Sequence, residues 1–437
     1  MSEHFPYRGD RLYAEDVPVA EIAAAVGTPF YLYSAGALQA RYRNFIDAFR
    51  PQHPLVCYAV KANSNLAVLR VFAGLGAGAD VVSEGELRRA LAAGIPRERI
   101  VFSGNGKTAT ELEAALVADI RQINVESISE LRRLSDIALV RRQTARAAIR
   151  VNPDVDALTH AKLTTGKKES KFGIDIAEAA EAYALAAELP GIEPVGLAVH
   201  IGSQMTETGP YRAAFERMAE LVLELRTLGH DVRSLDLGGG LGIRYHAETP
   251  IEPAAYAALV RETVGGLGLE LAFEPGRFLC GPAGLLVARV LYVKDGASRR
   301  FVIVDAAMND LIRPAMYNAW HDVVPADLPT SGAVAPADVV GPVCEPGDTF
   351  AIARDLPELS EGDLVALTNA GAYGAVMSST YNSRLLVPEV LVAADRFAVV
   401  RPRQSYEQLL AADRIPDWLN EAADTAVQPP ARKRGAA

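Results

Sequence analysis

The sequence contains few cysteines, and this scarcity argues against several kinds of site. Cys57, Cys280 and Cys344 are odd in number, lie far apart and form no Cys-x-x-Cys pair. A disulfide scaffold and a cysteine-based zinc centre are therefore not expected, and no other metal site is indicated. A reducing cytoplasm is the compartment that best fits three widely spaced cysteines.

Long apolar runs and blocks of positive charge are also missing. No stretch approaches the roughly 20 apolar residues that a membrane-spanning helix needs, and the first residues lack the basic-then-apolar order of a secretion signal. Lysine and arginine total 44 against 54 acidic residues, which gives a formal net charge of −10, and the basic residues are dispersed. We therefore expect neither a membrane nor nucleic acid among the partners.

The pattern of apolar segments predicts two domains within the 437 residues. From about residue 36 to 277, short β-branched runs alternate with helical stretches rich in alanine, leucine and glutamate, which predicts a (β/α)8 barrel of the TIM type. An open doubly wound sheet is the alternative. The expected barrel strands are Val56–Val60, Ala79–Val82, Ile100–Ser103, Gln122–Val125, Ala147–Val151, Gly196–His200, Ser234–Leu237 and Leu269–Glu274.

The rest of the chain has a different pattern of apolar residues. Residues 278–425 contain β-rich runs separated by Gly/Pro turns, which predicts a mostly antiparallel β domain that residues 1–35 join. Within it, residues 322–338 are expected to form a surface insertion. The end of the chain, 426–437, is expected to be a disordered tail.

Lys61 is the first candidate catalytic residue because of the residues around it. It ends the apolar run Leu55–Val60 and is followed by the small and polar residues Ala62 and Asn63. We expect a buried strand that delivers one amine to its C-terminal end, where α/β barrels place their chemistry. A partly desolvated amine loses its proton more readily, as a Schiff-base lysine must. The alternative is a lysine that caps the strand and points to water.

Two glycine-rich stretches invite a nucleotide-binding interpretation that their spacing does not support. For Gly104–Thr108 to be a P-loop, position 101 would have to be glycine, and it is Val101. In Gly238–Ile243 the last glycine required by a dinucleotide fingerprint is an isoleucine. The triplet Gly238–Gly240 instead follows an expected strand, where its backbone N–H groups would suit a phosphate, although a lone triplet is more often a tight turn.

Two other expected strands end in ionisable residues. Glu274 leaves the last barrel strand, and a carboxylate there needs a cation, either Arg277 or a protonated pyridine nitrogen. A purely structural Glu–Arg pair is equally open. His200 ends another strand; a histidine there is usually a core residue, but at this rim its ring suits stacking on a flat cofactor.

Three segments of the β domain carry further candidates, each of which is ordinary loop packing when taken alone. Cys344 and Glu345 place a thiol beside a carboxylate in a Pro/Gly loop. Tyr373 offers a phenol on a flexible turn. Arg313 and Tyr317 lie four residues apart and suit a carboxylate ligand.

Six short motifs occur in the order found in one enzyme family. They are Tyr-Ala-Val-Lys-Ala-Asn, His-Ile-Gly-Ser-Gln, Gly-Gly-Gly-Leu-Gly, Glu-Pro-Gly-Arg, Gly-Pro-x-Cys-Glu and Gly-Ala-Tyr-Gly. With them, the sequence resembles the fold-type III pyridoxal-phosphate-dependent decarboxylases from about residue 26 to 392. The resemblance implies an alanine racemase-like barrel, pyridoxal 5'-phosphate as the cofactor, and loss of carbon dioxide from an amino acid.

The resemblance also implies a role for each candidate residue. Lys61 would bind the cofactor aldehyde, Glu274 would keep the pyridine nitrogen protonated, and His200 would stack on the ring. Arg150 would contact the phenolic oxygen of the ring. The phosphate would be bound by Gly238, Gly239, Gly240, Ser203, Gly276, Arg277 and Tyr373. The substrate would be bound by Arg277, Arg313, Tyr317, Tyr373 and Glu345.

A shared active site and a substrate are implied as well. In this family Cys344 and Glu345 reach the site of the neighbouring subunit, so the resemblance implies a homodimer in which Cys344 protonates the carbanion and Glu345 recognises the distal ammonium group. Glu345 together with Arg313 favours meso-2,6-diaminopimelate, with L-lysine as the product, because relatives specific for ornithine or arginine typically carry Cys-Asp there. The alternatives are decarboxylation of ornithine, arginine or a carboxy-polyamine, and a non-catalytic cofactor-binding homologue.

Overall fold

A computed structural model describes residues 3–50, 52–157, 166, 170–329 and 333–419. The tail expected to be disordered lies outside these residues. None of the helices within them has the length and apolar character that crossing a bilayer requires.

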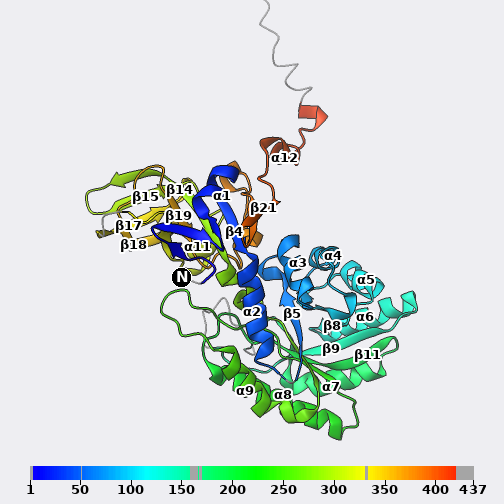
Figure 1. Cartoon of the computed structure of the whole chain (residues 1–437). Helices are drawn as coiled ribbons and strands as arrows, with labels where there is room; N and C mark the ends of the chain where they lie inside the picture. Colours follow the sequence, from blue (N-terminus) through cyan, green and yellow to red (C-terminus); the bar gives the residue numbers. More distant parts are fainter. Residues whose placement is uncertain (1–2, 51, 158–165, 167–169, 330–332, 420–437) are drawn as a thin grey trace, which may run out of the picture.

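Eight parallel strands close into a barrel (Figure 1), which confirms the expected fold and excludes the open sheet. Closure is made where the last strand pairs with the first, with Phe273 opposite Val56. A short strand, β10 (Ile174–Asp175), adds to β9. The barrel strands are β5 (Leu55–Ala59), β6 (Gly78–Val81), β7 (Ile100–Phe102), β8 (Gln122–Val125), β9 (Ala145–Asn152), β11 (Ile192–Val199), β12 (Ser234–Asp236) and β13 (Glu270–Phe273).

Helices cover the outside of the barrel, and polar caps define where several of them begin. Thr108 and Glu111 form a reciprocal capping box. At the similar Ser83 only half of such a box forms, because the Glu86 carboxylate accepts from Val82 N–H at 2.9 Å. The helices are α2 (Ala35–Asp47), α3 (Leu66–Gly74), α4 (Glu84–Ala92), α5 (Ala109–Ala118), α6 (Ile128–Arg141), α7 (Ile176–Glu188), α8 (Thr208–Thr227) and α9 (Pro253–Thr263).

A second sheet, mostly antiparallel, combines a strand that precedes the barrel in the chain with strands that follow it. Its central strand β14 pairs with the N-terminal strand β4, and β4 pairs on its other side with β20. The strands are β4 (Phe30–Ser34), β14 (Gly284–Asp295), β15 (Arg300–Val304), β16 (Val323–Pro325), β17 (Val334–Val340), β18 (Thr349–Pro357), β19 (Leu364–Leu367), β20 (Glu389–Ala393) and β21 (Arg396–Arg401).

Short elements complete the structure around this sheet. The expected surface insertion at 322–338 is wrong for its first part, because β16 pairs with β19 and both Val323 and Ala326 are buried, whereas residues 327–328 and 333–336 are exposed. The apolar runs in this segment are too short to be recognised as strands from the sequence. The remaining elements are β1 (Tyr7–Arg8), β2 (Arg11–Ala14), β3 (Val17–Pro18), α1 (Val19–Val26), α10 (Arg277–Cys280), α11 (Arg313–Tyr317) and α12 (Tyr406–Leu410).

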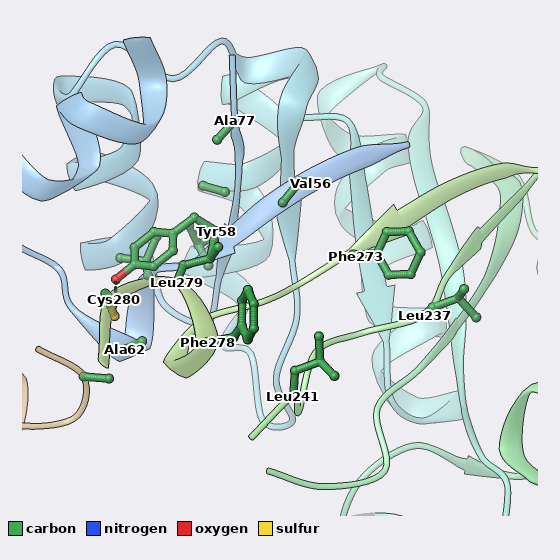
Figure 2. Packing of buried hydrophobic residues seen from close by; sticks show 14 of the residues in the cluster. Val56, Tyr58, Ala62, Ala77, Leu237, Leu241, Phe273, Phe278, Leu279 and Cys280 are labelled. Carbon is green, nitrogen blue, oxygen red and sulfur yellow. Dashed lines mark hydrogen bonds between the residues drawn. The ribbon is translucent and has the colours of Figure 1, made fainter. Parts of the chain in front are cut away.

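Aromatic packing fixes the seam where the barrel closes (Figure 2). The rings of Phe49 and Phe273 lie 4.5 Å apart between centroids. The Tyr58 hydroxyl donates to the carbonyl of Asn63 at 3.0 Å and lies 3.2 Å from Sγ of Cys280 in α10. Strand β5, the turn after it and the end of β13 are therefore held by one buried cluster.

Candidate active site

Lys61 lies in a 3-10 turn, Val60–Ala62, directly after β5. Its Nζ donates to Oδ2 of Asp80 at 2.7 Å, and Asp80 itself is fully buried at the end of the neighbouring strand β6. The expectation of a lowered pKa is wrong for this arrangement. Burial favours the neutral amine, but the negative charges of Asp80 and Glu274 outweigh it and raise the pKa of Lys61 above its ordinary value.

A cavity of about 370 Å³ opens in front of Lys61 at the C-terminal ends of the barrel strands. The Lys61 side chain is 34% exposed, because its outer part faces this space. The cavity is lined by Lys61, Val82, Ser103, Gly104, Asn105, Asn124, Arg150, Phe172, Ala198, Val199, His200, Asp236 and Glu274.

Glu274 is held in this cavity by neutral donors. Ser103 Oγ donates to its carboxylate at 2.8 Å, and the Asn124 amide lies between Glu274 (3.5 Å) and Asp236 (3.3 Å). Burial and the negative charges of Asp236 and Asp80 raise the pKa of Glu274 well above its usual range. The possible Glu274–Arg277 pair does not form, so this carboxyl remains available to a cation from outside the chain.

His200 and the glycine triplet are joined by a hydrogen bond at the same rim. The backbone N–H of Gly239 donates to Nδ1 of His200 at 3.1 Å. Burial, and then the positive charge of Lys61, lowers the pKa of His200 well below its usual range, so the ring is neutral. A Cβ on Gly239 would lie 2.2 Å from the carbonyl oxygen of Glu274, and one on Gly240 would lie 2.3 Å from that of Gly202. Only glycine fits where these strand ends meet.

A second cavity, of about 160 Å³, adjoins the first and shares Lys61, His200 and Glu274 with it. Two buried guanidinium groups belong to this cavity, those of Arg277 and Arg313. Its lining consists of Ala59, Lys61, His200, Ser203, Gly240, Leu241, Glu274, Gly276, Arg277, Arg313, Tyr317, Tyr373 and Met377.

Tyr373 reaches the second cavity from the β domain. Its backbone N–H donates to the carbonyl of Ala62, beside Lys61, at 2.8 Å. The Arg277 guanidinium lies 4.7 Å from the centre of its ring. Gly276 packs here against Ala59 and Ala62, where an added Cβ would lie 3.0 Å from each methyl group. The β domain therefore closes one side of the barrel mouth.

Cys344 and Glu345 are the candidates that the structure does not bring to this site. Both are exposed, and neither lines either cavity. Their loop is held by a hydrogen bond from the Cys344 N–H to Oδ1 of Asn382 at 3.1 Å. Arg150 does line the first cavity, where it forms a buried ion pair with Glu126 at 2.6 Å.

Several site residues are absent from the sequence-based prediction. Asp80 interrupts an otherwise apolar strand, and that interruption is a signal that could have found it, whereas Asn124 and Asp236 lie in strands that contain another polar residue, Gln122 or Ser234. Tyr245 and His321 lie in irregular segments without a comparable signal.

Comparisons with known proteins agree with this geometry. The family described as pyridoxal-dependent decarboxylase, pyridoxal binding domain, matches residues 35–281. A diaminopimelate decarboxylase from Pseudomonas aeruginosa is 50% identical over 411 residues, with 94% of this chain and 99% of that protein covered. One from Zymomonas mobilis is 47% identical over 420 residues, with 95% and 99% covered.

Solved structures of this kind also superimpose on the chain. Diaminopimelate decarboxylase from Helicobacter pylori, complexed with L-lysine, gives a TM-score of 0.87 at 42% identity and covers 93% of this chain and 100% of its own. The protein from M. jannaschii, in co-complex with L-lysine, gives 0.91 at 35% identity, with 95% and 99% covered. The chain therefore belongs to the pyridoxal-dependent decarboxylases and, within them, to the diaminopimelate decarboxylase family.

Proposed function

We propose that this protein is a carboxy-lyase that uses pyridoxal 5'-phosphate to convert meso-2,6-diaminopimelate into L-lysine and carbon dioxide, the last step of lysine biosynthesis. One observation carries the proposal: the amine of Lys61 lies where two cavities meet. Both cavities are lined by the buried Glu274, and the second also contains the two arginines, Arg277 and Arg313. The ring of an aldehyde cofactor suits the first cavity, whereas its phosphate and the distal end of a dicarboxylic amino acid would share the second, which Ser203, Gly240 and Tyr373 also line.

The residues present fit the cofactor. The glycine triplet packs against neighbouring backbone too closely for any Cβ, which suits a phosphate bound by backbone groups, and a buried carboxyl with neutral hydrogen-bond donors suits its ring nitrogen. Lys61 would bind its aldehyde and His200 would lie against its ring. When bound, the cofactor supplies an electron sink for the bond to carbon dioxide. The phosphate would be held by Gly238, Gly239, Gly240, Ser203, Gly276, Arg277 and Tyr373.

The charged groups around Lys61, Glu274 and His200 determine where protons lie in the first cavity. The Lys61 ammonium donates to Oδ2 of Asp80, 2.7 Å away, so the amine would have to lose a proton before it could act as a nucleophile. Glu274, whose pKa is raised, can share a proton with a basic nitrogen in front of it. Neutral His200 adds no charge that would oppose a cationic ring.

The distal end of the substrate would be bound in the second cavity. Arg277 and Arg313 are buried, and the ring of Tyr317 lies 5.9 Å from the Arg313 guanidinium. A carboxylate from the substrate would neutralise charges that are costly to bury alone. This requirement favours diaminopimelate over ornithine or arginine, which have no distal carboxylate.

We further propose a homodimer in which Cys344 and Glu345 act in the partner's site. Their exposure and their absence from the lining of both cavities of their own chain support this role. Cys344 would protonate the carbon that loses carbon dioxide, and Glu345 would bind the distal ammonium group. Mixing inactive Lys61→Ala and Cys344→Ala proteins tests this arrangement, because exchanged dimers would contain one complete site. Failure to recover activity despite proven subunit exchange would refute shared sites.

The domain division that we propose has a barrel over 36–277 and a β domain made of 1–35 and 278–425. The pairing of β4 with β14 and β20 supports it. We also propose a reducing cytoplasm, because the exposed thiol of Cys344 must stay reduced to deliver a proton.

A turnover assay tests the function directly. We expect carbon dioxide and L-lysine from meso-diaminopimelate, with much slower release from the LL and DD isomers, ornithine and arginine. A clear preference for ornithine or arginine would refute the substrate assignment. Lys61→Ala should abolish turnover, and an active Lys61→Ala protein would refute the assignment of the amine.

A further inference from the structure

The two arginines of the second cavity have neutral partners. Arg277 is 4% exposed and Arg313 is 5% exposed. Within the described residues, Arg277 donates to the hydroxyls of Tyr245 at 2.8 Å and Ser203 at 3.1 Å, and Arg313 donates to His321 at 3.4 Å. These partners orient the guanidinium groups without neutralising them, so the positive charge remains for an anionic ligand.

The hydrogen bonds of His321 define its protonation state. Its Nδ1 lies 2.8 Å from the carbonyl oxygen of Thr368, which can only accept, so Nδ1 carries the proton. Its Nε2 faces Nε of Arg313, which can only donate, so Nε2 is the acceptor. A neutral imidazole satisfies both contacts. Burial, and then the charge of Arg313, lowers the pKa of His321 to about 3, which keeps it neutral.

His321 is itself held from two sides. Its ring is fully buried and anchored by Thr368, while Nη1 of Arg354 donates to its backbone carbonyl at 3.0 Å. The Arg354 guanidinium also stacks on the neighbouring Trp320, 3.3 Å from the ring centre. The imidazole therefore presents a fixed acceptor to Arg313.

Fixing Nε of Arg313 determines which part of the guanidinium remains for a ligand. Among the described residues, the hydrogen bond that Arg313 donates runs through Nε to His321. Its two Nη groups then remain for a ligand in the second cavity, which Arg313 lines. A carboxylate can approach a guanidinium through such a pair of donors, which gives directional recognition as well as charge.

Tyr245 links the two arginines. Its ring centre lies 5.8 Å from the Arg277 guanidinium and 5.2 Å from that of Arg313. His321 packs edge-on against the same ring, at 5.4 Å and an interplanar angle of 76°. One phenol therefore lies within 6 Å of both guanidinium groups, accepts a hydrogen bond from Arg277, and packs edge-on against the imidazole that orients Arg313.

We propose that His321 and Tyr245 are positioning residues that set the specificity of the second cavity for a distal carboxylate. His321 fixes the orientation of Arg313, and Tyr245 fixes that of Arg277 through the hydrogen bond that it accepts. The inference rests on the proposed function, in which that cavity holds the amino-acid end of the substrate that is not decarboxylated. Neither residue needs to touch the substrate.

Two variants of His321 test the two hydrogen bonds of its ring separately. His321→Gln keeps an acceptor near the position of Nε2, whereas His321→Asn keeps only a donor towards Thr368. His230→Asn, which changes a histidine outside both cavities, is the matched control. Cofactor absorbance and the unfolding temperature show whether each holoenzyme is intact.

Two ligands that differ by one carboxylate provide the assay. L-lysine retains the amino-acid end that would face Arg313, and 1,5-diaminopentane lacks its carboxylate. In calorimetric titrations of the holoenzyme, we expect His321→Asn to weaken L-lysine about tenfold, the effect of losing one hydrogen bond to a charged group. Binding of 1,5-diaminopentane should be unchanged, and His321→Gln should recover most of the affinity for L-lysine. In turnover, His321→Asn should raise KM more than it lowers kcat.

The proposal would be overturned if His321 had no specific effect on the affinity for the ligand that carries the carboxylate. If wild-type protein binds both alike, or if His321→Asn leaves L-lysine binding intact or weakens both ligands equally, His321 does not set carboxylate specificity. A wild-type protein that releases no carbon dioxide from diaminopimelate would refute the proposed function instead. The ligand comparison would still decide the role of His321.

Discussion

Adding one methyl group at Gly239 should disrupt the cofactor site more than any nearby surface change. The new Cβ would lie 2.2 Å from the carbonyl oxygen of Glu274, which is backbone and cannot rotate away. Ordinary contacts are about 3.5–4.0 Å, so one strand end must move by roughly 1 Å or more. That movement would disturb the hydrogen bond from Gly239 to His200 and the bond from Glu274 N–H to the Gly238 carbonyl.

The expected magnitude follows from the cost of overpacking. Inserting a methyl group into a well-packed site costs about 1–3 kcal/mol. If that cost destabilises only the cofactor-bound protein, the affinity of Gly239→Ala for pyridoxal 5'-phosphate drops by roughly 5- to 150-fold. Equilibrium titration, followed by cofactor absorbance or protein fluorescence, measures this difference.

Gly85→Ala is the matched control for the same chemical change. Gly85 lies in helix α4, and its added Cβ would be 3.7 Å from the nearest atom, Oγ of Ser83. It should gain about 0.5–1 kcal/mol of stability from better helix propensity and keep wild-type cofactor affinity. Wild-type affinity in Gly239→Ala would refute the contact argument, as would an equal loss in both variants.

Three further predictions concern pH, stability and turnover. Burial raises the pKa of Asp310 to about 7, above the ~3.9 of an unfolded aspartate; its stabilising contribution is therefore complete at low pH and lost as pH rises towards 7. The unfolding temperature of wild type should fall from pH 4 to 7 relative to Asp310→Asn, and parallel curves would contradict this. Tyr33→Phe removes the buried hydrogen bond to Glu389 at 2.7 Å and should cost about 1.5–3 kcal/mol in denaturant unfolding; a loss as small as that of exposed Tyr292→Phe would count against it. Cys344→Ala should keep the cofactor but slow turnover by roughly 10²-fold or more, and wild-type kcat would exclude the thiol as proton donor.

The barrel is predictable because its strands are buried on both faces. Such strands are short, continuous apolar runs, and all eight expected ranges overlap observed strands. The β domain is harder, because short strands such as β16 carry too few residues to show a period. Its combination of segments before and after the barrel depends on the pairing of β4 with β14 and β20, which is non-local.

The candidate site is only partly predictable, for an electrostatic reason. Motifs at strand ends identify Lys61, His200 and Glu274, which do line one cavity. The direction of the Lys61 pKa depends on Asp80, which lies on the next strand and contacts Nζ only after folding. Burial and charge act in opposite directions on this amine, and the sequence motif conveys the first effect alone.

Positioning residues escape motif analysis because their function lies in their hydrogen bonds. His321 and Tyr245 come from irregular segments, and nothing beside them in the chain marks them as functional. Their importance appears once Thr368 and Arg313 are seen on opposite sides of one imidazole, which leaves a single possible tautomer. A buried arginine without an acidic partner is thus a useful starting point, because the neutral residues that orient it define what the site can bind.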